Sequence, residues 1–99
     1  MYSYIVGKVV SVHKKSIVIE NNYKGYYVFC PKPDVFEKDK TIRLYVYKYT
    51  YLSNKNALKE DLYGFKRWEE KEFFLNCLNI SGIGPKSAMN FLQNDIDVL

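Results

Sequence analysis

Residues 80–87, Ile-Ser-Gly-Ile-Gly-Pro-Lys-Ser, form a glycine-rich turn between two segments whose apolar residues have helical spacing. Gly82 and Gly84 permit backbone angles that side chains disfavour, and Pro85 suits the first position of a helix. Apolar side chains recur at i, i+3 and i+4 on both sides. They are Phe74, Cys77 and Leu78 before the turn, and Ala88, Phe91 and Leu92 after it. The stretch therefore predicts a helix, a tight hairpin and a second helix.

Such a hairpin leaves backbone N–H groups near Gly82 to Lys86 without partners, at the positive end of the second helix. Phosphate is a suitable partner for them, and Lys86 and Ser87 add a cation and a hydroxyl. The simpler alternative is a glycine-capped helix followed by another helix, with no ligand. We favour a phosphate site. Its predicted members are Gly82, Ile83, Gly84, Lys86 and Ser87.

The order of apolar, glycine and small residues in this stretch resembles the helix-hairpin-helix motif of DNA-binding proteins. The residues that carry the resemblance are Ile80, Gly82, Ile83, Gly84, Ala88, Phe91 and Leu92. The motif grips a nucleic-acid backbone, so the resemblance implies a DNA-binding protein.

Basic residues are concentrated before this motif. The chain has 99 residues and a formal net charge of +4. Residues 1–66 hold twelve Lys or Arg against six Asp or Glu, whereas residues 67–99 hold three against five. The basic part is a candidate surface for nucleic acid. Lysines that only solvate a small β domain would give the same counts, so charge alone does not separate the two interpretations.

The first two thirds of the chain show the patterns of β-strands. The predicted strands are residues 4–12, 16–20, 26–30, 41–52 and 57–65. Gly7 predicts a bulge or bend in the first strand. The connector 31–40 carries two prolines, and its Val35 and Phe36 are expected to close one end of the barrel. Five strands are the number found in an OB-fold barrel, a fold that often binds nucleic acid.

The pattern changes from alternation to helical spacing at residues 65–67. The predicted fold class is therefore β plus α, with an OB-fold barrel over 1–65 and a helix-hairpin-helix segment over 66–99. Trp68 is expected to anchor the junction between them. Asn94 or Asp95 would cap a third helix beginning near Ile96. That helix is barely started, so we expect an incomplete second domain and a longer parent protein.

Four short motifs occur in a recognisable order: Gly7-Lys8-Val9, Gly25-Tyr26-Tyr27-Val28, Leu62-Tyr63-Gly64-Phe65 and Ser81-Gly82-Ile83-Gly84-Pro85-Lys86. Together they resemble the RuvA family, the Holliday-junction-binding subunits of the bacterial branch-migration complex. The resemblance covers the whole chain. It implies a homotetramer that opens a four-way junction on a basic face, where paired helix-hairpin-helix motifs grip the duplex arms through their phosphates without reading base sequence.

The same resemblance implies a non-catalytic subunit that acts in recombination and DNA repair. In the family, a RuvB-type hexameric ATPase supplies the motor activity. It docks through a C-terminal domain, which we expect to lie outside this chain together with the second hairpin.

One departure from the family pattern lies in the loop before residues 62–65. RuvA proteins usually carry adjacent acidic residues at this hairpin tip, where they repel phosphates at the junction centre. Here the tip is Asn54-Lys55-Asn56, and Glu60 and Asp61 lie in the following strand. We expect Lys55 to attract the DNA backbone. Junction binding would then persist while selectivity for the junction centre falls.

Two alternative functions stay open. Tyrosines of the fourth predicted strand, facing away from Ile42, Leu44 and Val46, would stack bases in a single-stranded DNA-binding module. They would otherwise pack between subunits. A helix-hairpin-helix glycosylase would need Asp95 or Asp97 as its catalytic aspartate. We favour it less, because a barrel and two helices offer no enclosed pocket.

Other kinds of site receive little support from the sequence. The single histidine, His13, lies beside lysines and away from any nucleophile or carboxylate cluster, so it is expected to be a turn residue. Cys30 and Cys77 are far apart and form no CxxC pair, which predicts neither a zinc site nor a disulfide. Without an apparent leader or a long apolar run, we expect a cytoplasmic protein that uses no metal, cofactor or membrane.

Overall fold

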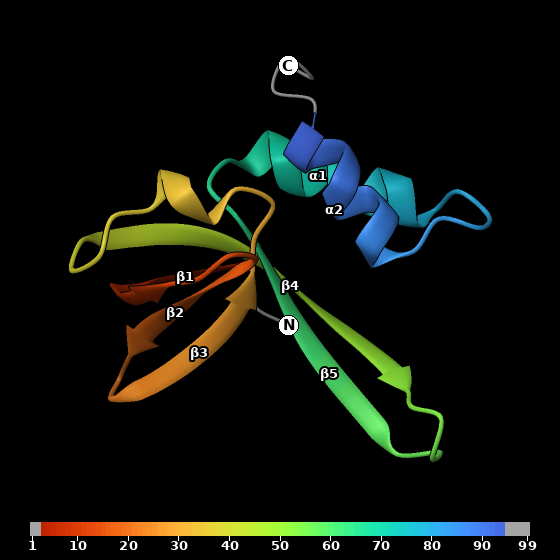
Figure 1. The fold of residues 1–99 in the computed structure, drawn as a ribbon, viewed down its shortest axis with the longest axis horizontal. Helices are drawn as coiled ribbons and strands as arrows, with labels where there is room; N and C mark the ends of the chain where they lie inside the picture. The colour runs from red at the N-terminus through yellow and green to blue at the C-terminus, as the bar shows by residue number, and fades with distance from the viewer. Residues whose placement is uncertain (1–2, 95–99) are drawn as a thin grey trace.

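The computed structural model describes residues 3–94 and shows a closed five-stranded barrel followed by two helices (Figure 1). Its elements are β1 (Tyr4–Val12), β2 (Ser16–Asn21), β3 (Lys24–Phe29), the 3-10 turn η1 (Pro33–Val35), β4 (Thr41–Leu52), β5 (Leu58–Phe65), α1 (Trp68–Leu78) and α2 (Pro85–Asn94). The strand order around the barrel is β1-β2-β3-β5-β4, and the pairing of β3 with β5 is parallel. The OB-fold barrel and the two helices are confirmed. The division into domains at residues 65–67 stays a prediction, and the third helix near Ile96 lies outside the described residues.

The predicted irregularity of β1 is present, but it is not at the predicted glycine. The pairing of β1 with β2 shifts register between Val9 and Ser11, which places the bulge beyond Gly7. Glycine is needed at position 7 for another reason, because a Cβ atom there would collide with the backbone carbonyl oxygen of Glu20. The prediction of a bulge at Gly7 is therefore wrong in position.

The barrel interior is filled by side chains from β1 to β4 and the connector. The buried members are Ile5, Val9, Ile17, Ile19, Val28, Cys30, Phe36, Leu44 and Val46. Phe36 closes the barrel as predicted, whereas Val35 is 44% exposed, so its predicted role is wrong. The end of the 3-10 turn explains the difference, because the turn ends at Val35 and Phe36 follows with extended backbone, φ −98° and ψ 139°, so the two side chains point in different directions. Only one of two neighbouring apolar residues can then face the core.

A second core joins the barrel to the helices. Its buried residues are Tyr63, Phe65, Phe74, Cys77, Ala88 and Leu92. The Phe74 ring centroid lies 5.0 Å from that of Phe65 and 5.1 Å from that of Tyr63. Tyr63 packs on Tyr49 at 6.4 Å, and Tyr49 stacks on Tyr51 at 5.7 Å. These five rings, here called the aromatic ladder, run from α1 outward along the β4–β5 hairpin.

The outer face of β4 is therefore used within the chain. Tyr47 and Tyr49 are partly buried against the second core, and Tyr45 meets the Trp68 ring edge-to-face at 5.8 Å. Trp68 is 43% exposed yet contacts β4, as expected for a residue between barrel and helices. These tyrosines hold the helices on the barrel.

The predicted apolar face of α2 is only partly correct. Ala88 and Leu92 are buried, but Phe91 is 46% exposed. Met89 packs against the second core instead. Residues 88, 89 and 92 turn toward α1 and the barrel, which leaves position 91 on the outer side of the helix.

Phe74→Ala should lower the free energy of unfolding by about 3–5 kcal/mol, because it leaves a cavity where α1 meets Tyr63 and Phe65. Phe91→Ala is the matched control and should cost less than about 1 kcal/mol, since that ring is partly exposed. Urea unfolding of both variants measures the difference. Equal losses would contradict the assignment of Phe74 as the contact that joins the helices to the barrel.

Candidate nucleic-acid interface

The hairpin between α1 and α2 is built from two successive turns. The N–H of Ile80 donates to the Cys77 carbonyl at 3.0 Å, and the N–H of Ile83 donates to the Ile80 carbonyl at 3.1 Å. Gly82 has φ of +86°, in the left-handed region that favours glycine. The Ile83 side chain packs against the second core. Backbone turns and an apolar anchor thus define the shape of the hairpin.

The first turn of α2 presents unpaired donors to solvent. Its first helical bond is from the Ala88 N–H to the Gly84 carbonyl, at 3.1 Å. Within residues 3–94, the N–H groups of Gly82, Gly84, Lys86 and Ser87 have no backbone acceptor. No acidic residue lies in this first turn, so the positive helix end keeps its charge. The arrangement suits an anion.

The predicted site residues share this surface. Gly82, Lys86 and Ser87 are exposed, and a Cβ atom added at Gly84 would meet nothing within 4 Å. Gly84 therefore leaves open space beside the free donors. The Ile83 N–H already donates to the Ile80 carbonyl within the hairpin. Phosphate contact by Ile83 stays a prediction.

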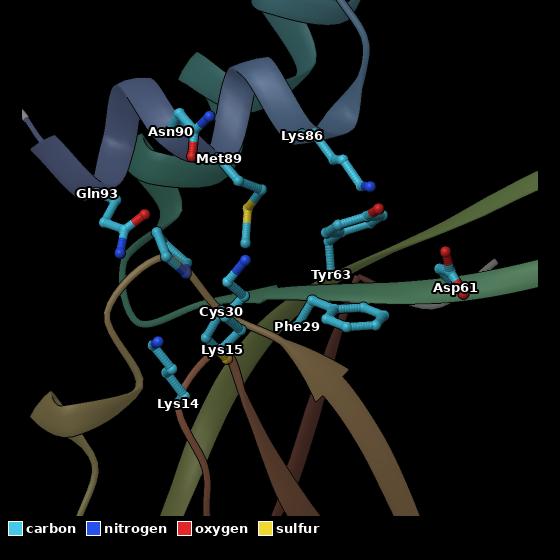
Figure 2. Close-up of a pocket in the computed structure, with 11 residues that line it drawn as sticks. Lys14, Lys15, Phe29, Cys30, Asp61, Tyr63, Lys86, Met89, Asn90 and Gln93 are labelled. Carbon is cyan, nitrogen blue, oxygen red and sulfur yellow. The ribbon is translucent and has the colours of Figure 1, made fainter.

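A cleft of about 260 Å³ separates α2 from the barrel (Figure 2). Its walls come from the β1–β2 turn, the end of β3, β5 and α2. The lining residues are Lys14, Lys15, Phe29, Cys30, Pro31, Asp61, Tyr63, Lys86, Met89, Asn90 and Gln93. Lys86 lines the cleft and also belongs to the hairpin, so the two features are continuous. Sequence analysis did not predict Lys14 and Lys15 as site residues, because their proximity to residue 86 arises from barrel closure.

Two buried side chains that line the cleft, Cys30 and Tyr63, have raised pKa values. Burial raises the pKa of the Cys30 thiol to about 12, and the charge of Glu70 adds to the effect. Burial, followed by the charge of Asp61, raises the pKa of Tyr63 to about 12. Thiol nucleophiles react as thiolates, so Cys30 is unreactive near neutral pH. In the described part of the chain, no three His, Cys, Asp or Glu side chains gather as metal ligands.

His13 lies outside this chemistry. Its ring nitrogen is 2.9 Å from the Ser11 hydroxyl oxygen, and the ring stacks on Tyr27. The structure places it in the β1–β2 turn, as predicted. Asp95 and Asp97, the candidate glycosylase aspartates, lie outside the described residues.

The β4–β5 hairpin projects away from the barrel (Figure 1). Its tip is ordered by Ser53, whose hydroxyl oxygen accepts hydrogen bonds from the N–H groups of Lys55 and Ala57 at 3.3 and 3.2 Å. Asn56 has φ of +59°, which asparagine tolerates better than most residues. Lys55 is exposed at this tip.

The two nearby carboxylates do not replace an acidic tip. The Glu60 carboxylate lies 3.6 Å from the Lys48 ammonium. Asp61 is partly buried and lines the cleft beside Tyr63. The hairpin tip therefore presents a cation and two amides to solvent.

The aromatic ladder leaves little ring surface for bases. Tyr49 and Tyr63 are packed within it, and the outermost ring, Tyr51, is 36% exposed. A single-stranded DNA platform needs several accessible ring faces in succession. The structure thus gives weak support to that alternative.

Comparisons with known proteins relate this chain to one family. The family model described as the RuvA N terminal domain matches residues 1–64. A Holliday junction branch migration complex subunit RuvA from Malacoplasma penetrans is 39% identical over 99 residues, which is 100% of this chain and 45% of the relative. The proteins of the same name from Ureaplasma parvum and Pediococcus pentosaceus are 38% and 42% identical, over 98% and 96% of this chain and 50% and 46% of their own lengths. The chain thus spans about half the length of these curated relatives. Within residues 3–94, no helix is long and apolar enough to cross a membrane.

Proposed function

Because the chain belongs to the RuvA N-terminal domain family, we propose that it binds four-way, or Holliday, junction DNA as a non-catalytic subunit of a branch-migration complex. The observation that carries this proposal is the exposed hairpin at the start of α2. Its free backbone donors, open space at Gly84 and adjacent Lys86 suit a phosphodiester backbone. The process served would be recombination and DNA repair in the cytoplasm.

Recognition through these groups is independent of base sequence. Backbone N–H groups and a lysine ammonium contact phosphate oxygens, which are the same at every base pair. Ser87 adds a hydroxyl donor, and Ile83 anchors the hairpin against the second core. Selectivity then comes from the shape of the junction.

The proposed oligomer, domain division and motor partner rest on the resemblance to the family. We propose a homotetramer in which residues 1–65 form the barrel domain and residues 66–99 begin the second domain. An outward strip on β1 gives a candidate contact between subunits. Its apolar members are Tyr4, Val6, Val10 and Val12, each between 37% and 47% exposed. A RuvB-type hexameric ATPase would supply the motor, docked through the C-terminal domain that the family resemblance implies.

Competition binding tests the proposed function. A labelled synthetic four-way junction is challenged with unlabelled junction, duplex or single-stranded DNA of equal nucleotide content at matched salt. We expect the junction to compete best and its affinity to fall steeply with salt, because phosphate contacts release counterions. Stronger competition by single-stranded DNA would favour the base-stacking module. Base release from lesion-containing duplex would favour the glycosylase.

Gly84→Val should weaken junction binding about tenfold or more while leaving the unfolding midpoint unchanged. The added side chain would occupy the open space beside the free donors, where a Cβ atom meets no neighbouring protein atom within 4 Å. Gly84→Ala should show a smaller loss, whereas Gly82→Val should also disorder the hairpin, because its φ is positive. Titration with labelled junction and thermal unfolding provide the two readouts. Loss of binding accompanied by global unfolding in Gly84→Val would refute the claim.

Lys55→Glu should raise the ratio of junction affinity to duplex affinity severalfold. A carboxylate at the hairpin tip repels phosphates that pass near the tip, whereas Lys55 attracts them on any DNA. Lys38→Glu is the matched control, because it makes the same charge change in the connector before β4, at the opposite end of that strand. Its ratio should equal that of the unaltered chain. If Lys55→Glu leaves the ratio of junction to duplex affinity unchanged, the β4–β5 hairpin tip does not lie at the junction centre.

A further inference from the structure

The β1–β2 turn is held rigidly beside the cleft. The N–H of His13 donates to the Ser16 carbonyl at 2.8 Å, which closes the turn. The N–H of Cys30 donates to the Lys15 carbonyl at 3.1 Å, which fixes the turn to the end of β3. Cys30 itself is buried in the barrel core. The backbone that carries Lys14 and Lys15 is therefore preorganised.

Lysines reach into the cleft from both of its sides (Figure 2). The Lys15 side chain extends from the turn toward α2, and the Lys86 side chain extends from α2 toward Tyr63 on β5. Lys14 lies on the barrel side, farther from Lys86 than Lys15 does in this view. Three lysines and one carboxylate, that of Asp61, thus line the cleft. Between residues 3 and 94, no salt bridge neutralises any of these three lysines.

The remaining lining suits the sugar and phosphate of a nucleic-acid strand. Pro31, Met89 and the rings of Phe29 and Tyr63 supply apolar surface. Asn90 and Gln93 add amide donors from α2. Ammonium groups on a rigid turn bind phosphate as point charges without reading bases.

We propose that Lys14 and Lys15 form a second phosphate-binding element, so that a DNA strand held by the hairpin continues across the cleft to the barrel. This inference rests on the proposed function and adds residues to its binding surface. Lys86 is common to the hairpin and the cleft, and it marks where the strand passes from one to the other. The α1–α2 hairpin and the barrel would then bind the same DNA backbone. Lys14 and Lys15 would give each subunit a second contact with DNA besides this hairpin.

The test compares the double variant Lys14→Gln/Lys15→Gln with Lys24→Gln in the full chain. Lys24 begins β3, and the cleft is at the end of that strand, so it is a matched lysine away from the site. Junction affinity is measured at salt concentrations from about 50 to 200 mM. The double variant should lose roughly tenfold in affinity or more, and its slope of log affinity against log salt should fall by about two. Lys24→Gln should retain both values.

Other outcomes separate this inference from the proposed function. No junction binding by the unaltered chain would overturn both. Normal junction binding with an unchanged salt slope in the double variant would overturn the second element alone, as would an equal loss in Lys24→Gln. If the double variant instead lowered the mass of the oligomer in solution and kept its slope, the cleft would bind an acidic segment of a neighbouring copy. Thermal unfolding of each variant checks that the fold is retained.

Discussion

Phe74 of α1 packs against β5, and the positions of the α1–α2 hairpin and the cleft depend on this contact. Its ring lies against Phe65 and Tyr63, and through Tyr63 it connects to the rings that line the β4–β5 hairpin. Aromatic pairs of this kind add directional preference to the burial of apolar area. The contact therefore sets how the helices are oriented on the barrel. That orientation determines where the α1–α2 hairpin points and how wide the cleft beneath α2 is.

The same aromatic ladder limits what the barrel surface can do. An OB-fold barrel with many tyrosines on one strand has the composition of a base-stacking platform, but these rings are used to hold α1 and the β4–β5 hairpin. Backbone donors and lysines are the groups left free near α2. The chain therefore has more means of holding phosphates than of holding bases. This difference favours a duplex-arm binder over a single-strand binder with the same fold.

Much of the fold was predictable because it depends on local patterns. Alternation in residues 4–12 and 41–52 indicated strands, and Gly82, Gly84 and Pro85 indicated the hairpin, since turn chemistry is decided within a few residues. Val35 and Phe91 were misassigned because periodicity identifies apolar positions without showing which of them a neighbouring element covers. The cleft was missed for a related reason. The distance in sequence between Lys15 and Lys86 carries no information until the barrel closes and α2 packs beside β5.

The charges around the site show how a RuvA-type surface could work without acidic residues at its hairpin tip. An acidic tip acts by repulsion, and it separates strands only when other groups hold the DNA firmly enough to bring phosphates near it. In this chain Glu60 is paired with Lys48, Asp61 lines the cleft, and the tip carries Lys55. Under the proposed function, attraction would operate at the tip, at the α1–α2 hairpin and along the cleft. The selectivity that we propose would then come from the relative positions of these attractive elements, because a regular duplex and an open junction offer phosphates in different directions. The rigid contacts at Phe74 and at the β1–β2 turn are what would keep those positions constant.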